Sequence, residues 1–153
     1  MKTVSVAESM TCGNLASKFG SVSGASKYFK GGIVCYWLEA KENILNISNK
    51  ELTKVNCVSV SVAKQMAKNV SNLFNTDFGL STTGYAEDPK NYKEFISDKS
   101  LLMIPHAYIC LYDKSKDIYI NKLVKNSNCN RVEMQNYVVD ACYKLFQTEI
   151  LAR

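Results

Sequence analysis

Apolar and polar positions in the first part of the chain follow two periods, one typical of strands and one typical of helices. Residues 3–7 (TVSVA) predict a β-strand, and residues 12–20 predict a helix. The segment 21–25 is small and turn-like. Residues 27–37 predict a second strand, with a glycine pair at a bend or a close approach.

Helical periodicity dominates the next part. Short helices are expected at 38–45 and around 49–56, and the clearest helix is 59–74, where apolar residues recur every three or four positions. Ser59 stands where an N-cap is expected.

The second half predicts strands and a closing helix. A strand at 77–84 runs into a polar stretch, 85–100, without periodicity, and a loop of this length is usually functional or mobile. Strands at 105–112 and 117–124 read as a hairpin, and a helix from 129 to 150 closes the chain.

This order of elements predicts a three-layer α/β/α sandwich around a mixed sheet. The 153 residues contain no linker and no internal repeat, so we expect one domain over residues 1–153. No apolar run reaches membrane-spanning length and the first residues lack the layout of a signal peptide, so we expect a cytoplasmic protein with no membrane partner.

The net charge of +5 comes almost entirely from lysine. Arg131 and Arg153 are the only arginines, so no arginine-rich patch for nucleic acid is present, and we expect no nucleic-acid partner. A mildly basic surface around a site for a small anion fits this composition equally well.

Cysteine and histidine usage argues against a metal site. The six cysteines show no CxxC spacing, and without a secretion signal they are expected to be reduced thiols that serve as small apolar side chains. His106 is the only histidine, so a zinc site or a Ser-His-Asp triad would have a single imidazole available. An ordinary, partly buried histidine is the alternative to a catalytic one.

A polar cluster between the first strand and the first helix carries the candidate chemistry. Such a turn holds the hydroxyls of Ser9 and Thr11 at the edge of the sheet, beside free backbone N–H groups. That arrangement suits an activated serine with oxyanion donors. The alternative is an ordinary Ser/Thr helix cap.

Five segments resemble, in order and at matching spacing, the motifs of the CinA C-terminal domain family, also called PncC, the nicotinamide-nucleotide amidohydrolases. They are AESMTCG at 7–13, GASKYF at 24–29, GIVCYWLEAK at 32–41, VS at 58–59 and TTGYA at 82–86. The family's versions are AESCTGG, GSSxxF, GxVxYSNEAK, AVS and SGIAGP. The resemblance spans roughly residues 3 to 146 and implies the fold of that domain.

The resemblance implies hydrolysis of the carboxamide of nicotinamide mononucleotide, or of a related pyridine nucleotide, to the nicotinate form and ammonia. Ser9 would then be the nucleophile and Lys41 the base, and Tyr36 would line or polarise the site. A serine hydroxyl needs an adjacent base, and a partly desolvated lysine can lose its charge to act as one, so neither a cofactor nor a metal is required. A solvated helix lysine is the alternative for Lys41.

The same motifs imply the remaining roles. Thr11 and the backbone N–H groups around Cys12 and Gly13 would form the oxyanion hole, while Glu8 would cap that turn or orient Lys41.

Ser26, Thr83 and Gly84 would contact substrate together with Glu8 and Gly13. Arg131, which matches the first arginine of the family's GDRxxxR, would bind the nucleotide phosphate, with a surface salt bridge as the alternative. Homo-oligomers are expected from the resemblance.

The sequence departs from the family's motifs mainly in the segments that are expected to recognise the substrate. The second arginine of GDRxxxR is Gln135, and GIAGPxGG has become GYAEDPKN at 84–91, where Glu87 and Asp88 would repel a phosphate. Residues 105–109 (PHAYI) add bulk where the family has PVGTV. The chain also starts at the first strand, without the helix that precedes it in the family and without the larger N-terminal domain of full-length members.

Two hypotheses follow. The chain is an active amidohydrolase, or it is a weak or inactive homologue that binds a nucleotide or a protein partner.

Overall fold

Five strands form one mixed sheet in the computed structural model, which describes residues 2–151. The strands are β1 (Val4–Glu8), β2 (Phe29–Val34), β3 (Phe78–Tyr85), β4 (His106–Asp113) and β5 (Ile118–Lys125). Their order in the sheet is β2-β1-β3-β4-β5. β1 runs parallel to both of its neighbours, whereas β3–β4 and β4–β5 pair antiparallel.

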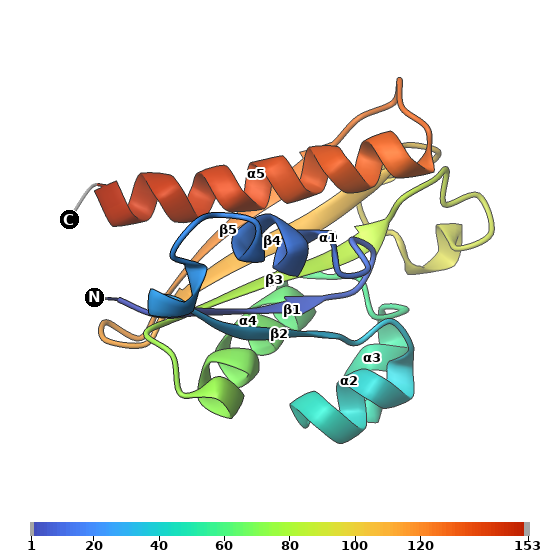
Figure 1. Ribbon diagram of the computed structural model, residues 1–153. Helices are drawn as coiled ribbons and strands as arrows, with labels where there is room; N and C mark the ends of the chain where they lie inside the picture. Colours follow the sequence, from blue (N-terminus) through green and yellow to red (C-terminus); the bar gives the residue numbers. More distant parts are fainter. Residues whose placement is uncertain (1, 152–153) are drawn as a thin grey trace.

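Helices cover both faces of this sheet. They are α1 (Asn14–Gly20), α2 (Leu38–Leu45), α3 (Asn49–Lys54), α4 (Val60–Phe74) and α5 (Arg131–Leu151). α1 and α5 pack on one face, and α2, α3 and α4 lie on the other (Figure 1). The predicted three-layer α/β/α sandwich with a mixed sheet is confirmed.

β1 is buried along its whole length, because it lies inside the sheet with helices above and below. Val4 and Val6 belong to the apolar cluster shared with α1 and α5. Ala7 belongs to the cluster shared with α2 and α4. Alternate side chains of β1 therefore pack against the helices on the two faces of the sheet. Packing on both faces fixes the position of the strand's end.

The predicted helix at 59–74 is confirmed together with its cap. α4 begins at Val60, and the Ser59 hydroxyl accepts a hydrogen bond from the Val62 amide at 3.1 Å. A Ser side chain at this position satisfies one of the amide groups that the first turn of a helix leaves unpaired.

Two predicted boundaries are wrong. α1 begins at Asn14 rather than at residue 12, because Cys12 (φ 51°) and Gly13 (φ 96°) adopt left-handed backbone angles that end the turn before the helix starts. The strand predicted at 27–37 covers only Phe29–Val34, and a 3₁₀ turn, η1 (Ala25–Lys27), precedes it.

The long segment between β3 and β4 is not structureless. It contains two 3₁₀ turns, η2 (Lys93–Phe95) and η3 (Lys99–Leu101). We call residues 86–104 the β3–β4 loop.

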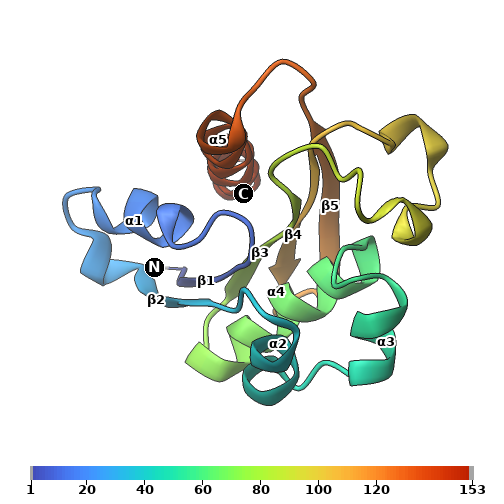
Figure 2. The same cartoon turned by 90° about the vertical axis from the view of Figure 1, so that its right-hand side faces the viewer.

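The carboxyl ends of β1, β2 and β3 meet at one edge of the sheet, which Figure 2 shows face-on together with the β3–β4 loop. Open α/β sheets place their ligand sites at this kind of edge. No helix among the described residues is both long and apolar enough to cross a membrane.

Candidate active site

Ser9 lies at the carboxyl end of β1, at the edge shared by the three parallel strands. Its amide donates to the Thr82 carbonyl at 3.0 Å, which continues the β1–β3 pairing by one residue beyond Glu8. The Ser9 residue is only 8% exposed. Regular pairing thus holds the hydroxyl-bearing residue in a fixed place at the end of a buried strand.

Lys41 reaches Ser9 from α2. Its side chain is fully buried, and its Nζ lies 3.1 Å from the Ser9 Oγ. The amine also donates to the Cys35 carbonyl at 2.6 Å and to the Tyr36 carbonyl at 3.0 Å. The predicted contact between Ser9 and Lys41 is confirmed, and Lys41 is not a solvated helix lysine.

Burial lowers the pKa of Lys41 below its ordinary value of 10.5, because desolvation penalises the charged amine. The nearby thiols of Cys57 and Cys35 act in the opposite direction. A neutral amine has two N–H groups and one lone pair. The two carbonyls that face Nζ can take the N–H groups, which leaves the lone pair for the Ser9 hydroxyl.

Glu8 occupies the N-terminus of α1. Its carboxylate accepts hydrogen bonds from the amides of Gly13 (3.1 Å), Leu15 (2.9 Å) and Ala16 (2.8 Å) and from the Thr11 hydroxyl (2.7 Å). A carboxylate at this position satisfies the unpaired amides and suits the positive end of the helix dipole. Of the two predicted roles of Glu8, the structure therefore shows the cap.

The Thr11 hydroxyl and the amides of Cys12 and Gly13, predicted to form the oxyanion hole, have hydrogen-bond partners within the protein. The Gly13 amide bonds to Glu8, the Cys12 amide donates to the Ser9 carbonyl at 3.1 Å, and the buried Thr11 hydroxyl is held between Glu8 and Thr82. Glu8 and Gly13 are engaged with each other, and their contact with substrate stays a prediction.

Two backbone amides close to Ser9 have no hydrogen-bond partner among the residues that the structure describes. Within residues 2–151, the backbone N–H groups of Met10 and Thr11 have no protein acceptor. Met10 also lines the cleft described next. Its carbonyl accepts a hydrogen bond of 2.8 Å from the Gln135 side chain of α5.

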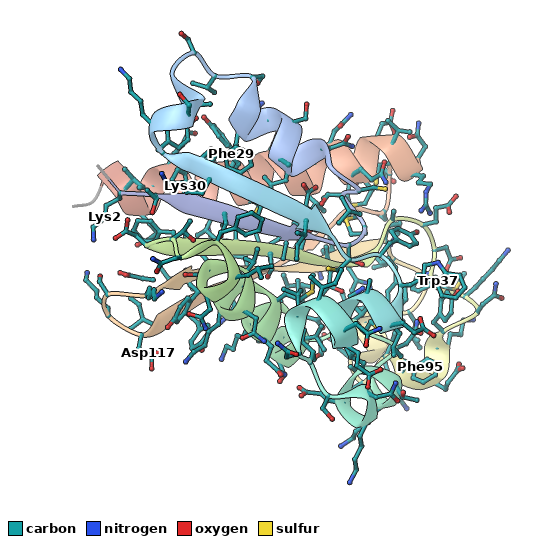
Figure 3. The ribbon with its side chains drawn as sticks, turned by 60° about the horizontal axis from the view of Figure 1, so that its bottom comes forward. Lys2, Phe29, Lys30, Trp37, Phe95 and Asp117 are labelled. Carbon is teal, nitrogen blue, oxygen red and sulfur yellow. The ribbon has the colours of Figure 1, made fainter. Side chains whose placement is uncertain are left out.

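A cleft of about 870 Å³ opens above Ser9 and Lys41. Its walls come from residues 36–38, 56–58 and 83–92, completed by Met10 and Arg131. Trp37 is 74% exposed and stands out at the end of the molecule where Phe95 of the β3–β4 loop also lies (Figure 3). Ser9 and Lys41 both line this cleft, so a small molecule that enters it can reach Ser9, of which 8% is exposed.

Thr83 and Gly84 line this cleft at the end of β3. The Thr83 hydroxyl donates to the Cys57 carbonyl at 2.7 Å. A Cβ at Gly84 would lie 2.3 Å from the His106 carbonyl oxygen, so the close approach of β4 leaves no room for a larger residue. Both residues lie where the prediction places them, and their contact with substrate remains a prediction.

Arg131 spans the rim of the cleft. One guanidinium nitrogen donates to the Glu87 carboxylate at 2.9 Å and the other to the Tyr36 hydroxyl at 2.7 Å. The salt bridge that the sequence left as the alternative for Arg131 is present. Tyr36 thus lines the site, as predicted, and its hydroxyl also holds the arginine.

Two other sequence-based candidates lie outside the cleft. Ser26 is exposed in η1, which precedes β2, whereas the cleft lies beyond the other end of that strand, so its predicted substrate contact is wrong for this cleft. His106 is buried, and its Nδ1 lies 2.7 Å from the Ile104 carbonyl. Burial lowers the pKa of His106, which behaves as an ordinary core histidine.

Gln135 is the residue that the sequence reasoning missed. The sequence presented it only as a lost arginine, and nothing in its spacing indicates that it reaches the turn after Ser9.

In the part of the chain that the structure describes, no three His, Cys, Asp or Glu side chains gather so that they could hold a metal ion. All six cysteines are free thiols.

Comparison with known proteins gives a consistent result. The CinA C-terminal domain profile matches residues 1–150. A CinA-like protein of Prochlorococcus marinus (strain AS9601) is 36% identical over 151 residues, which is 99% of this chain and 34% of the relative. A protein of Thermoanaerobacter sp. (strain X514) named for competence-damage induction is 55% identical over 130 residues, 85% of this chain and 30% of the relative. The chain thus spans about a third of the length of these relatives.

Solved structures show the same fold. Competence damage-inducible protein A from Klebsiella pneumoniae superposes with a TM-score of 0.84 at 17% identity, covering 98% of this chain and 87% of that one. A competence/damage inducible protein from Agrobacterium tumefaciens gives a TM-score of 0.82 at 21% identity, with 96% and 84% covered.

Proposed function

The chain belongs to the CinA C-terminal domain family, and from that premise we propose that it is an amidohydrolase that converts the carboxamide of nicotinamide mononucleotide, or of a related pyridine nucleotide, into a carboxylate and ammonia. One observation carries the proposal: the Lys41 amine lies 3.1 Å from the Ser9 hydroxyl at the base of an accessible cleft. A module that only binds has no need of a buried lysine against a serine.

The first half of the reaction forms a covalent intermediate. The Ser9 Oγ attacks the carboxamide carbon while Lys41 in its neutral form, which burial favours by lowering its pKa, accepts the hydroxyl proton. The amide N–H of Met10, which follows the nucleophile and has no acceptor within residues 2–151, stabilises the negative oxygen that develops. Collapse of this intermediate breaks the C–N bond, and the protonated Lys41 returns its proton to the leaving ammonia.

The second half hydrolyses the acyl-enzyme. Lys41 accepts a proton from water, the resulting hydroxide attacks the ester carbon, and the proton is returned to Ser9 as the carboxylate leaves. Over the full cycle one water is consumed, and one carboxylate and one ammonium ion are formed, because the carboxylic acid product gives its proton to ammonia. The carbonyls of Cys35 and Tyr36 hold the amine in place through both halves.

The test is release of ammonia by the purified protein from nicotinamide mononucleotide. Replacing the nucleophile (Ser9→Ala) or the base (Lys41→Met) is expected to lower kcat by about 10³-fold or more, as loss of a covalent nucleophile or its base does in other hydrolases. Ser17→Ala, the same chemical change at an exposed position of α1, is the control and should keep full activity.

Circular dichroism shows whether each variant folds. Undiminished ammonia release from folded Ser9→Ala would mean that the nucleophile lies elsewhere. If the wild type releases no ammonia but binds the nucleotide measurably, the second hypothesis, an inactive homologue that binds, takes the place of the first. The rewritten segment 84–91 and Gln135, which stands where the family has an arginine, favour this second hypothesis.

A further inference from the structure

The charged side chains that line the outer part of the cleft balance one another. They are Glu87, Asp88, Lys90 and Arg131, two acidic and two basic. Arg131, the only arginine there, is already bound to the Glu87 carboxylate at 2.9 Å. The cleft therefore offers a phosphate no arginine whose charge is unpaired.

A phosphate would compete directly with a side chain of the protein. To bind Arg131 it would either displace the Glu87 carboxylate or use the remaining guanidinium N–H groups beside it, and in both cases Glu87 would stand close to the new anion, with Asp88 next to it in the sequence. Exchanging one charge-assisted hydrogen bond for another gains little, and like charges placed close together repel. Phosphate binding at this rim should therefore contribute little to affinity.

The cleft is better suited to a flat, positively charged ring. Four aromatic side chains line it, Tyr36, Trp37, Tyr85 and Tyr92, and the last two stack with ring centroids 5.4 Å apart and an interplanar angle of 18°. Aromatic faces attract cations. The pyridinium ring that bears the carboxamide in nicotinamide nucleosides is such a cation, whereas the phosphate makes the mononucleotide an anion overall.

We propose that this cleft recognises its substrate by the cationic ring and not by a phosphate, so that its substrate class is the pyridinium carboxamide nucleoside. Glu87 is the specificity-determining residue, because it pairs with the arginine that a phosphate would need and offsets its charge. This inference rests on the proposed amidohydrolase function.

The experiment compares two substrates in the same ammonia assay, nicotinamide mononucleotide and nicotinamide riboside, which lacks the phosphate. The measured quantity is the ratio of kcat/KM for the mononucleotide to kcat/KM for the riboside. In the wild type we expect a ratio below about ten. In Glu87→Gln, which frees the Arg131 guanidinium from a carboxylate, the ratio should rise at least about tenfold, the usual worth of a hydrogen bond between charged groups.

Asp140→Asn is the matched control. It removes one negative charge from α5, where Asp140 pairs with Lys18 and does not line the cleft, and it should leave the ratio unchanged. A wild-type ratio above about ten, a smaller rise in Glu87→Gln, or an equal rise in Asp140→Asn would overturn the inference while ammonia release still supports the amidohydrolase. If neither compound yields ammonia, the proposed function itself fails.

Discussion

Replacing Glu8 by glutamine tests the idea that this carboxylate holds α1 in place. The side chain is fully buried and accepts four hydrogen bonds, three from backbone amides and one from the Thr11 hydroxyl. Glutamine has nearly the same shape, so the change removes charge and one acceptor without leaving a cavity.

The magnitude follows from how the four donors divide between the two oxygens. One oxygen accepts from Thr11, Gly13 and Leu15, and the other accepts from Ala16 alone. A glutamine carbonyl can keep the first three, but its NH₂ group then faces the Ala16 amide, so two donors meet. The loss of one hydrogen bond to a charged group costs about 1.5–3 kcal/mol, and the lost interaction with the helix dipole adds about 0.3–1 kcal/mol. We expect the free energy of unfolding to fall by about 2–4 kcal/mol.

Urea denaturation followed by circular dichroism measures this difference. Glu39→Gln is the control, since Glu39 is an exposed acid in the first turn of α2, where the same change should cost no more than about 1 kcal/mol. A Glu8→Gln variant whose unfolding free energy stays within about 0.5 kcal/mol of the wild type, a margin typical of surface substitutions, would refute the reasoning.

Two further predictions concern the reaction. Gln135→Ala removes the hydrogen bond to the Met10 carbonyl, and we expect kcat for ammonia release to fall about tenfold while KM stays nearly constant, because a misplaced turn beside the nucleophile affects the chemical step; an unchanged kcat would show that Gln135 does not position the turn. The pH profile of kcat/KM should rise with pH and level off above the pKa of Lys41, since only the neutral amine accepts a proton, and its inflection should lie below 10.5 because burial lowers that pKa. An inflection at or above 10.5, or no ascending limb, would contradict a buried lysine base.

The alternation of strands and helices was predictable because its signals are local. α4 shows apolar residues at helical spacing with a serine cap, so a short stretch of chain contains all the information needed. The contact between Ser9 and Lys41 was predictable only through the resemblance to the family, since nothing in a lone serine and a lone lysine 32 residues apart indicates that they meet.

The contacts that the sequence did not predict depend on tertiary structure. Glu87 and Arg131 lie 44 residues apart, and their pairing depends on how the β3–β4 loop folds back over the cleft. Cys12 adopts a left-handed angle that its residue type does not favour, so α1 starts later than periodicity alone predicts. The four bonds of Glu8 arise because a buried strand delivers its last side chain to the first turn of the next helix.

The complete burial of β1 has a consequence for how this protein can be altered. Ser9, the proposed nucleophile, directly follows a fully buried strand, and such strands are expected to resist local opening, whereas the β3–β4 loop, which builds much of the opposite wall, lies outside the sheet. Replacing the β3–β4 loop is therefore expected to change which ligand the cleft binds while the contact between Ser9 and Lys41 is kept. In the proposed function, bond making would depend on Ser9 and Lys41, and much of the ligand contact would come from a loop that can be exchanged.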